Sequence, residues 1–200
     1  MKTIYRTISE QVADLIRNEI FSGEIEENSL LKEQELSDRF EVSRGTVRHA
    51  LMQLVAEGIV TSTPNIGMRV ASRPTEESLT LIIEVRNKIE DFIFRTVFDE
   101  LREKHLDGWG KQLKKLKDAS EQNSIESFMD ADIAFHRFFV ELYPDKHVTD
   151  LWEVARSRMM MRYNRLRDLK NGYEEHEKIY RAVTDGDIEK AVSLLHSNVI

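Results

Sequence analysis

The chain has 200 residues, of which 40% are hydrophobic and 32% are charged, and it contains no cysteine. This composition fits one or two globular domains and excludes disulfides and thiolate metal sites, so a bound metal would need histidine and carboxylate ligands. The formal net charge of −7 excludes a general attraction to nucleic acid, and a DNA-binding surface would have to concentrate its positive charge locally.

The sequence also argues against membrane insertion and secretion. No apolar run approaches the eighteen or so residues that a transmembrane helix needs. The first residues, MKTIYRTISEQ, lack the apolar segment of a signal peptide. We therefore expect a cytoplasmic protein with no membrane partner.

The first predicted helix begins with a capping box, because Thr7 is followed three residues later by Glu10. Gly23 is expected to end the helix. The apolar residues that recur at helical spacing are Ile8, Val12, Leu15, Ile16 and Ile20.

Two further helices are predicted before residue 58. The first follows Ser29, with Leu36 and Phe40 on one side, and a short turn at residues 41–42 separates it from the next. Ser43 is expected to cap that third helix and Gly58 to end it. Its buried face is predicted at Val47, Ala50 or Leu51, and Leu54.

Alternating residues then predict a β-hairpin, with strands at 59–63 and 68–71 joined by a turn at 64–67. Three helices followed by a hairpin is the order of a winged helix-turn-helix. In that module the start of the third helix enters the major groove of DNA. Arg44 and Arg48 lie there and could bind guanine, although two arginines one helical turn apart are also common on a solvated surface.

The segment LKEQELSDRFEVSRGTVRHALMQLVAEGIV, followed by PNIGMRVA, resembles the DNA-binding domain of the GntR family of bacterial transcription regulators. The resemblance covers about residues 8–71. Two departures are Glu27-Asn28, where many members have Pro-Gly, and His49, where glutamate is common; asparagine tolerates the left-handed backbone of such a turn. The resemblance implies DNA contacts at Arg39, Ser43, Arg44, Thr46, Arg48 and Gly67.

The second half of the chain reads as long helices, which predicts a mainly α protein with a C-terminal antiparallel six-helix bundle. We divide the chain into a winged helix-turn-helix domain at 1–73, a linker at 74–78 and a helical domain at 79–200. Gly172 and Gly186 are expected between helices. The six helices are predicted near 77–104, 107–121, 125–143, 147–170, 173–185 and 187–199.

One motif in the helical half suggests a metal site. In DADIAFHRFF, Asp132 and His136 are four residues apart and share a helix face, while His176 and His196 lie on later helices that could face them. One carboxylate and three imidazoles suit a divalent first-row metal. The alternative is four ordinary polar residues of a helical bundle.

The pattern DxxxH, then EHxxIYxAV, then GDxxxAxxxLxxH resembles the ligand-binding domain called FCD, which is attached to one GntR subfamily. The resemblance covers about residues 79–200, and six helices are similar to its shorter, VanR-like version. It implies metal ligands at Asp132, His136, His176 and His196, with zinc, nickel or manganese as the ion.

Arg86 stands where many such domains have the arginine that begins the effector pocket. A buried arginine beside a metal suits a carboxylate effector. The alternative is an exposed arginine paired with Glu90 on its own helix, which contributes only a few tenths of a kcal/mol.

These features together predict a homodimeric regulator, acting as a repressor, that binds an inverted-repeat operator and responds to a small organic acid. A metal-dependent hydrolase on a helical bundle is a second hypothesis, but the chain has no HExxH motif, no HD dipeptide and no dedicated base. A third is an acyl-CoA sensor like the longer relatives, which lack the metal-binding set.

Overall fold

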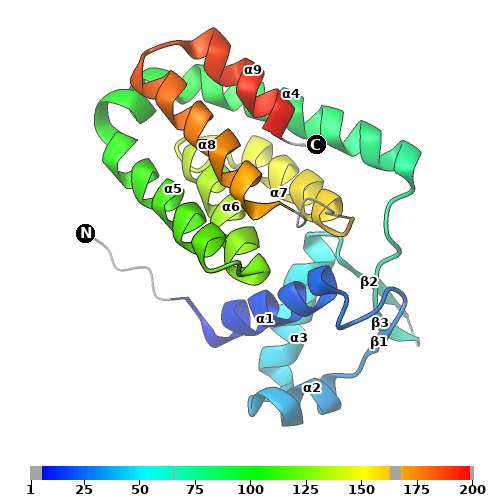
Figure 1. Ribbon diagram of the computed structural model, residues 1–200. Helices are drawn as coiled ribbons and strands as arrows, with labels where there is room; N and C mark the ends of the chain where they lie inside the picture. The colour runs from blue at the N-terminus through cyan, green and yellow to red at the C-terminus, as the bar shows by residue number, and fades with distance from the viewer. Residues whose placement is uncertain (1–5, 65, 163–167, 199–200) are drawn as a thin grey trace. The chain divides into compact units, whose positions relative to one another are not determined.

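The computed structural model describes residues 6–64, 66–162 and 168–198, and every structural statement below refers to them (Figure 1). The chain forms two compact units. The first contains the described residues up to Leu79 together with Arg156–Arg162, and the second contains the rest. We describe each unit by itself.

The first unit begins with α1 (Ile8–Ser22), and its predicted capping box is confirmed. The Thr7 hydroxyl accepts the Glu10 N–H at 3.2 Å, and the Glu10 carboxylate accepts the Thr7 N–H at 2.6 Å. Gly23 ends the helix with a left-handed φ of 86°, as expected. Both ends of α1 were therefore readable from local sequence.

The predicted apolar face of α1 is only partly right. Val12, Ile16 and Ile20 are buried, whereas Ile8 is 62% exposed and Leu15 is 50% exposed. Successive residues of a helix point about 100° apart, so Leu15 diverges from the face that Ile16 defines. The buried face is narrower than the list of apolar residues suggests.

Helices α2 (Glu33–Phe40) and α3 (Arg44–Ala56) form the helix-turn-helix. Glu41 ends α2 with a left-handed φ of 54°, and the Ser43 hydroxyl caps α3 by accepting the Thr46 N–H at 3.1 Å. The predicted core face of α3 is confirmed, since all its members are buried: Val47, Ala50, Leu51 and Leu54.

Three antiparallel strands form the wing, in the order β1-β3-β2. The hairpin of β2 (Val60–Thr63) and β3 (Gly67–Val70) follows the prediction, with Asn65 of its turn lying outside the described residues. Strand β1 (Leu30–Leu31) was not predicted. Before it, Asn28 adopts a left-handed φ of 64°, so the turn is made without glycine.

The second unit is built of helices. In chain order, the described residues form α4 (Glu76–Glu100), a π-helical turn η1 (Leu101–His105), α5 (Leu106–Glu121), α6 (Ile125–Val140), α7 (Lys146–Met160), α8 (Leu169–Thr184) and α9 (Ile188–Asn198). The end of α7 belongs to the first unit. Helix α5 packs against α6 and α8, and α8 packs against α9.

Helix α4 begins at Glu76, close to the predicted start near residue 77, and two other predictions in this half are wrong. Helix α7 ends at Met160 rather than near residue 170. Gly172 lies inside α8 instead of between helices, because Asp168 caps α8 earlier. A Cβ on Gly172 would lie 2.8 Å from the Phe128 ring, so this glycine permits close packing. Gly186, with φ 79°, separates α8 from α9 as predicted.

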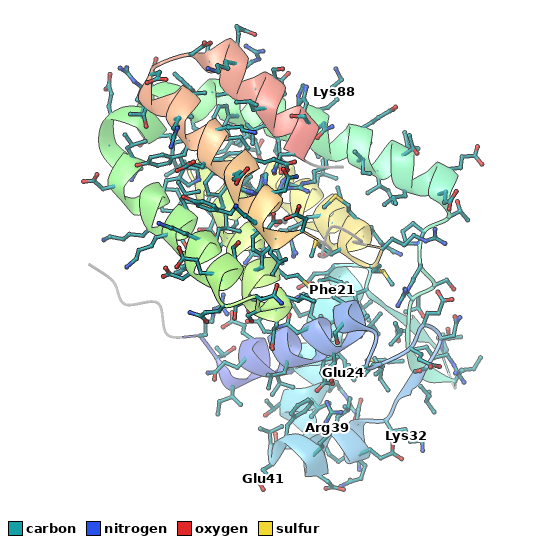
Figure 2. All side chains as sticks on the ribbon, viewed as in Figure 1. Phe21, Glu24, Lys32, Arg39, Glu41 and Lys88 are labelled. Carbon is teal, nitrogen blue, oxygen red and sulfur yellow. The ribbon has the colours of Figure 1, made fainter. Side chains whose placement is uncertain are left out.

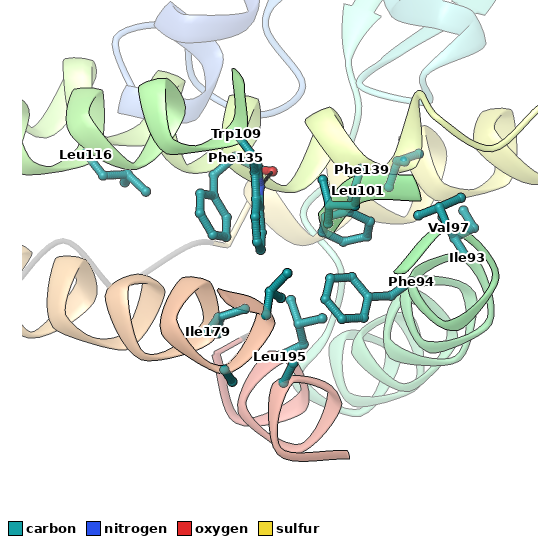
Figure 3. Close-up of a cluster of buried hydrophobic side chains, with 14 of the residues drawn as sticks. Ile93, Phe94, Val97, Leu101, Trp109, Leu116, Phe135, Phe139, Ile179 and Leu195 are labelled. Carbon is teal, nitrogen blue, oxygen red and sulfur yellow. Dashed lines mark hydrogen bonds between the residues drawn. The ribbon is translucent and has the colours of Figure 1, made fainter. Parts of the chain in front are cut away.

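An aromatic core fixes the position of α6 (Figure 3). Trp109 of α5 stacks on Phe135 at 4.5 Å between ring centroids, and its indole N–H donates to the Phe135 carbonyl at 2.9 Å. Phe94 and Phe139 pack edge to face beside them.

Among the described residues, none of the helices has the length and apolar character needed to cross a bilayer.

Candidate DNA interface and metal centre

The predicted DNA-contacting residues lie on the surface of the helix-turn-helix unit. Ser43, Arg44 and Arg48 are exposed at the start of α3, where Thr46 is half-buried. Gly67 is exposed in the wing, with a left-handed φ of 103°. Arg39, labelled in Figure 2, is exposed near the end of α2. All six could therefore reach a ligand.

Two of these arginines are held by carboxylates of the same unit. Arg48 donates from Nε and Nη2 to the two oxygens of Glu33, at 2.8 and 2.7 Å. Hydrogen bonding to Arg48 lowers the pKa of Glu33 below its usual value, and the charge of Arg44 adds to this effect. Arg39 pairs with Glu19. The exposed guanidinium of Arg44 has no such partner within the described residues.

The second unit gathers three of the four predicted metal ligands. Asp132 and His136 project from α6 and His176 from α8, and one potential ligand atom of each lies within 4.8 Å of the others. All three are buried. The i, i+4 spacing on α6 and the packing of the bundle produce this arrangement.

The hydrogen bonds of His176 indicate which ring nitrogen could bind a metal. Its Nδ1 lies 2.7 Å from the Gly172 carbonyl oxygen, which can only accept, so Nδ1 carries the proton. Nε2 is then the nitrogen available to a metal, and it lies 3.1 Å from an Asp132 carboxylate oxygen. A histidine whose second nitrogen donates to a backbone carbonyl is typical of metal sites.

The hydrogen bonds of His136, which involve Asn198 of α9, also indicate which ring nitrogen could bind a metal. The Asn198 amide nitrogen donates to Glu175 at 3.2 Å, which turns the amide oxygen towards His136 Nε2 at 3.1 Å. That nitrogen therefore donates, which leaves Nδ1 as the nitrogen available to a metal. A Glu90 carboxylate oxygen lies 3.4 Å from Nδ1.

Several electron-rich atoms here are buried with no hydrogen-bond partner among the described residues: His136 Nδ1, His176 Nε2 and Glu90 Oε2. Leaving such atoms unpaired is costly in free energy. A divalent cation would satisfy them, and its nitrogen and oxygen donors match those of first-row metals. The residues present therefore fit a metal ion.

The carboxylates of this site stay ionised. Burial alone would raise the pKa of Asp132, but His176, His136 and Arg86 outweigh burial and lower it. Burial likewise opposes ionisation of Glu90, yet Arg86 and His136 lower its pKa to about 2. Two negative charges are thus held inside the bundle.

Arg86 matches neither of its two predicted roles fully. Its Nε donates to Oε1 of Glu90 on the same helix at 2.8 Å. The pair is buried, since Arg86 is 2% exposed and Glu90 is 1% exposed. The Trp152 indole N–H donates to the same oxygen at 2.7 Å. Sequence reasoning missed Glu90 and Trp152 as parts of the site.

His196 is the predicted ligand that the structure does not bring into the group. It lies half-buried on α9, with its Nε2 atom buried and without a hydrogen-bond partner in the described part of the chain. Asn198, two residues later, contacts His136 instead. No spacing signal in the sequence marks Asn198.

Comparisons with known families identify both units. Residues 81–199 match the FCD domain, and residues 8–70 match the bacterial regulatory proteins of the gntR family. The protein is thus a transcription regulator with a winged helix-turn-helix and a helical effector-binding domain. It belongs to the FCD-containing GntR family.

The relatives are named as transcription factors. The chain is 27% identical over 204 residues to the gluconate operon transcriptional repressor of Bacillus licheniformis, covering 94% of this chain and 80% of that one. It is 27% identical over 197 residues to the regulator LutR of Bacillus subtilis, covering 84% and 87%. The predicted regulator class is confirmed, and the hydrolase hypothesis is not supported.

Solved structures show the same fold. Escherichia coli McbR/YncC superposes with a TM-score of 0.81 at 18% identity, covering 98% of this chain and 94% of that one. A GntR regulator from Rhodococcus sp. RHA1 gives 0.70 at 22% identity, covering 96% and 93%. These matches confirm the predicted winged helix-turn-helix and helical domain.

Proposed function

We propose that this protein is a homodimeric cytoplasmic repressor whose affinity for an inverted-repeat operator is set by a small carboxylate bound at a divalent metal. The effector half of this proposal is carried by the buried group of Asp132, His136 and His176. Among the described residues, the Nδ1 atom of His136 and the Nε2 atom of His176 have no hydrogen-bond partner. The operator half rests on the exposed start of α3.

In the DNA-binding unit, Arg44 and Arg48 read bases in the major groove, and Ser43 and Thr46 contact phosphates. The backbone at Gly67 places the wing, and Arg39 contacts the DNA backbone. Their exposure supports these roles. Two units in one dimer contact two half-sites, which raises affinity through effective concentration. The domain limits 1–73, 74–78 and 79–200 remain a prediction.

In the helical unit, Asp132, His136 and His176 hold Zn²⁺, Ni²⁺ or Mn²⁺. His196 is proposed as the fourth ligand on the strength of its buried, unpaired Nε2. A bound ion would supply Lewis acidity, to which a carboxylate oxygen of the effector could coordinate. This set of donors also counts against an acyl-CoA sensor, whose class lacks it.

The effector is an organic acid on two grounds. Arg86 is buried, and its positive charge helps to lower the pKa of Asp132. A cation that could bind a carboxylate therefore lies near the proposed metal ligands. One relative is named for the gluconate operon, and gluconate is a hydroxycarboxylate. We therefore propose a hydroxy or simple carboxylate as the chemical class and Arg86 as one of its ligands.

The metal half is tested by elemental analysis of purified full-length protein offered Zn²⁺, Ni²⁺ and Mn²⁺ in turn. We expect one ion per chain and a lower melting temperature after chelation, because an ion at one hundred times its Kd stabilises the folded state by about 2.7 kcal/mol. His136→Ala and His176→Ala should abolish both effects. His147→Ala, at an exposed position, is the matched control.

The effector is sought by repeating the melts with gluconate and other carboxylates, with and without chelator. A carboxylate that stabilises only the metal-loaded protein supports the proposal. Absence of stoichiometric metal from every preparation, with no change in melting on adding any of the three ions, would show that these residues are ordinary polar groups of the bundle.

The operator half is tested with Arg44→Ala and Arg48→Ala. Each lost bidentate base contact should cost about 1–3 kcal/mol per half-site. Operator duplexes are first selected from a random library with the wild-type protein, and affinities are then measured at one salt concentration. Wild-type affinity in both variants, with unchanged circular dichroism, would contradict the assignment of α3 as the recognition helix.

A further inference from the structure

A carboxylate sits within the surface that is proposed to face DNA. Glu33 is the first residue of α2, and both of its oxygens accept hydrogen bonds from Arg48 on α3, at 2.8 and 2.7 Å. The Glu33 side chain is 19% exposed, whereas that of Arg48 is 60% exposed. The acid therefore lies behind the arginine and leaves most of the guanidinium open.

The geometry of this pair leaves a free edge suited to a base. A guanidinium has five N–H donors in a rigid plane, and Glu33 engages the edge formed by Nε and Nη2. The remaining donors, on Nη1 and the outer side of Nη2, form a second parallel edge. Two parallel donors match the O6 and N7 acceptors of guanine in the major groove.

Glu33 also carries a charge that DNA phosphates repel. Arg44, on the same helix as Arg48, is close enough that its charge lowers the pKa of Glu33. The acid therefore partly neutralises both recognition arginines and weakens attraction to any DNA backbone. A correct base offsets this loss by bonding the free guanidinium edge, whereas an incorrect sequence does not.

We propose that Glu33 is a specificity-determining residue: it fixes Arg48 for guanine readout and suppresses binding to non-operator DNA. This inference rests on the proposed role of α3 at the operator. Glu33 acts through its contact with Arg48, so it is a positioning residue. Its removal should narrow the gap between operator and non-operator affinity, rather than weaken binding to all DNA.

The chain offers a matched control two residues away. Glu35 lies on the same helix and is exposed, and its side chain pairs with Lys32 at 2.6 Å. Glu33→Gln and Glu35→Gln remove the same charge from the same helix, but only the first changes the partner of Arg48. A general electrostatic effect would appear in both variants, and an effect on specificity in the first alone.

The experiment measures dissociation constants of full-length wild type and both variants for a library-selected operator duplex and a scrambled duplex of equal composition, at several salt concentrations. For Glu33→Gln we expect tighter binding to the scrambled duplex and a fall of about tenfold in the operator-to-scrambled ratio, within the range that one bidentate base contact supplies. For Glu35→Gln both affinities should rise together, with the ratio unchanged.

Three results are informative beyond this. An unchanged ratio in Glu33→Gln, or equal changes of the ratio in the two variants, overturns the inference. Glu33→Ala, checked with Glu33→Gln by circular dichroism, should give the same loss of ratio, and if it instead keeps the wild-type ratio the inference fails. A wild type that selects no sequence at all overturns the proposed operator role itself, which separates the two failures.

Discussion

Replacing Arg86 by methionine is expected to destabilise the helical domain strongly. Methionine keeps most of the apolar stem but removes the guanidinium. The Glu90 carboxylate then stays buried, with the Trp152 indole N–H still donating to Oε1. Glu90 is 1% exposed, so water cannot replace the lost partner. Its second oxygen already lacks a hydrogen-bond partner among the described residues.

The burial of the Arg86–Glu90 pair sets the size of the expected loss of stability. Removing one member of a buried ion pair typically costs about 3–5 kcal/mol, because an uncompensated charge remains inside. For a protein of this size that corresponds to a fall in melting temperature on the order of 10 °C. An exposed i, i+4 pair would contribute only about 0.3–0.5 kcal/mol, so the two descriptions of Arg86 differ by roughly tenfold.

The assay is urea unfolding of full-length protein in chelator, which removes any contribution from a metal. Arg95→Met is the exposed control, since Arg95 lies on the same helix and its ion pairs, with Asp91 four residues earlier and with Glu189, are exposed. We expect the control to lose far less stability than Arg86→Met, because solvent screens exposed ion pairs. The double variant Arg86→Met with Glu90→Gln should recover much of the loss, because it leaves no buried charge.

Equal, small losses in Arg86→Met and Arg95→Met would refute the reasoning. They would mean that Glu90 reaches solvent or is protonated in the folded protein. A large loss that the double variant does not recover would point to packing rather than charge.

Three further outcomes are expected. Leu81→Glu and Val85→Glu, at exposed apolar positions four residues apart on α4, should shift the proposed homodimer towards monomer, and an unchanged mass by light scattering at micromolar concentration would count against this. Gly172→Ala should cost about 1–3 kcal/mol in urea unfolding, because its Cβ meets the Phe128 ring at 2.8 Å. Because the pKa of Glu33 is lowered in the folded protein, its ionised form adds stability above the ordinary carboxyl pKa, and this stability is lost as the pH falls. On acidification Glu33→Gln should therefore lose less free energy of unfolding than wild type, by under about 1 kcal/mol. An identical pH profile of stability would contradict this.

Local signals in the sequence were enough to predict the helix ends that depend on them. The capping box of Thr7 and Glu10, the Ser43 cap and the left-handed Gly23 involve neighbouring residues only, and each is confirmed. Asn28, which stands where many family members have glycine, also adopts the left-handed backbone that this turn needs. Such features need no knowledge of the rest of the fold.

Features that depend on distant partners were not predicted. Strand β1 has two residues, too few to show alternation, and it exists because Leu30 and Leu31 pair with β3. Gly172 resembles a helix stop in the sequence, yet it lies inside α8, where the absence of a side chain lets the Phe128 ring approach. In each case the deciding neighbour is far away in the chain.

The candidate metal site shows the same division. The spacing of Asp132 and His136 predicted a shared helix face, and the structure places His176 beside them. Asn198 contacts His136 across 62 residues of sequence, and Trp152 contacts Glu90 across an equal separation, so helical spacing gives no hint of either. Periodicity identifies what one helix presents, whereas the packing of the bundle decides what that face meets.

Glu90 joins the two halves of the proposed effector site. One of its oxygens accepts from Arg86, and the other lies 3.4 Å from His136 Nδ1, the nitrogen whose lone pair we assign to the metal. A carboxylate effector that draws Arg86 towards itself must alter the charge that Glu90 presents to His136, and a metal at His136 must in turn alter how firmly Glu90 holds Arg86. Because coupling free energies are reciprocal, the factor by which metal changes effector affinity equals the factor by which effector changes metal affinity. The shared carboxylate gives that coupling a path of two contacts within α4 and α6, with no displacement of a helix required.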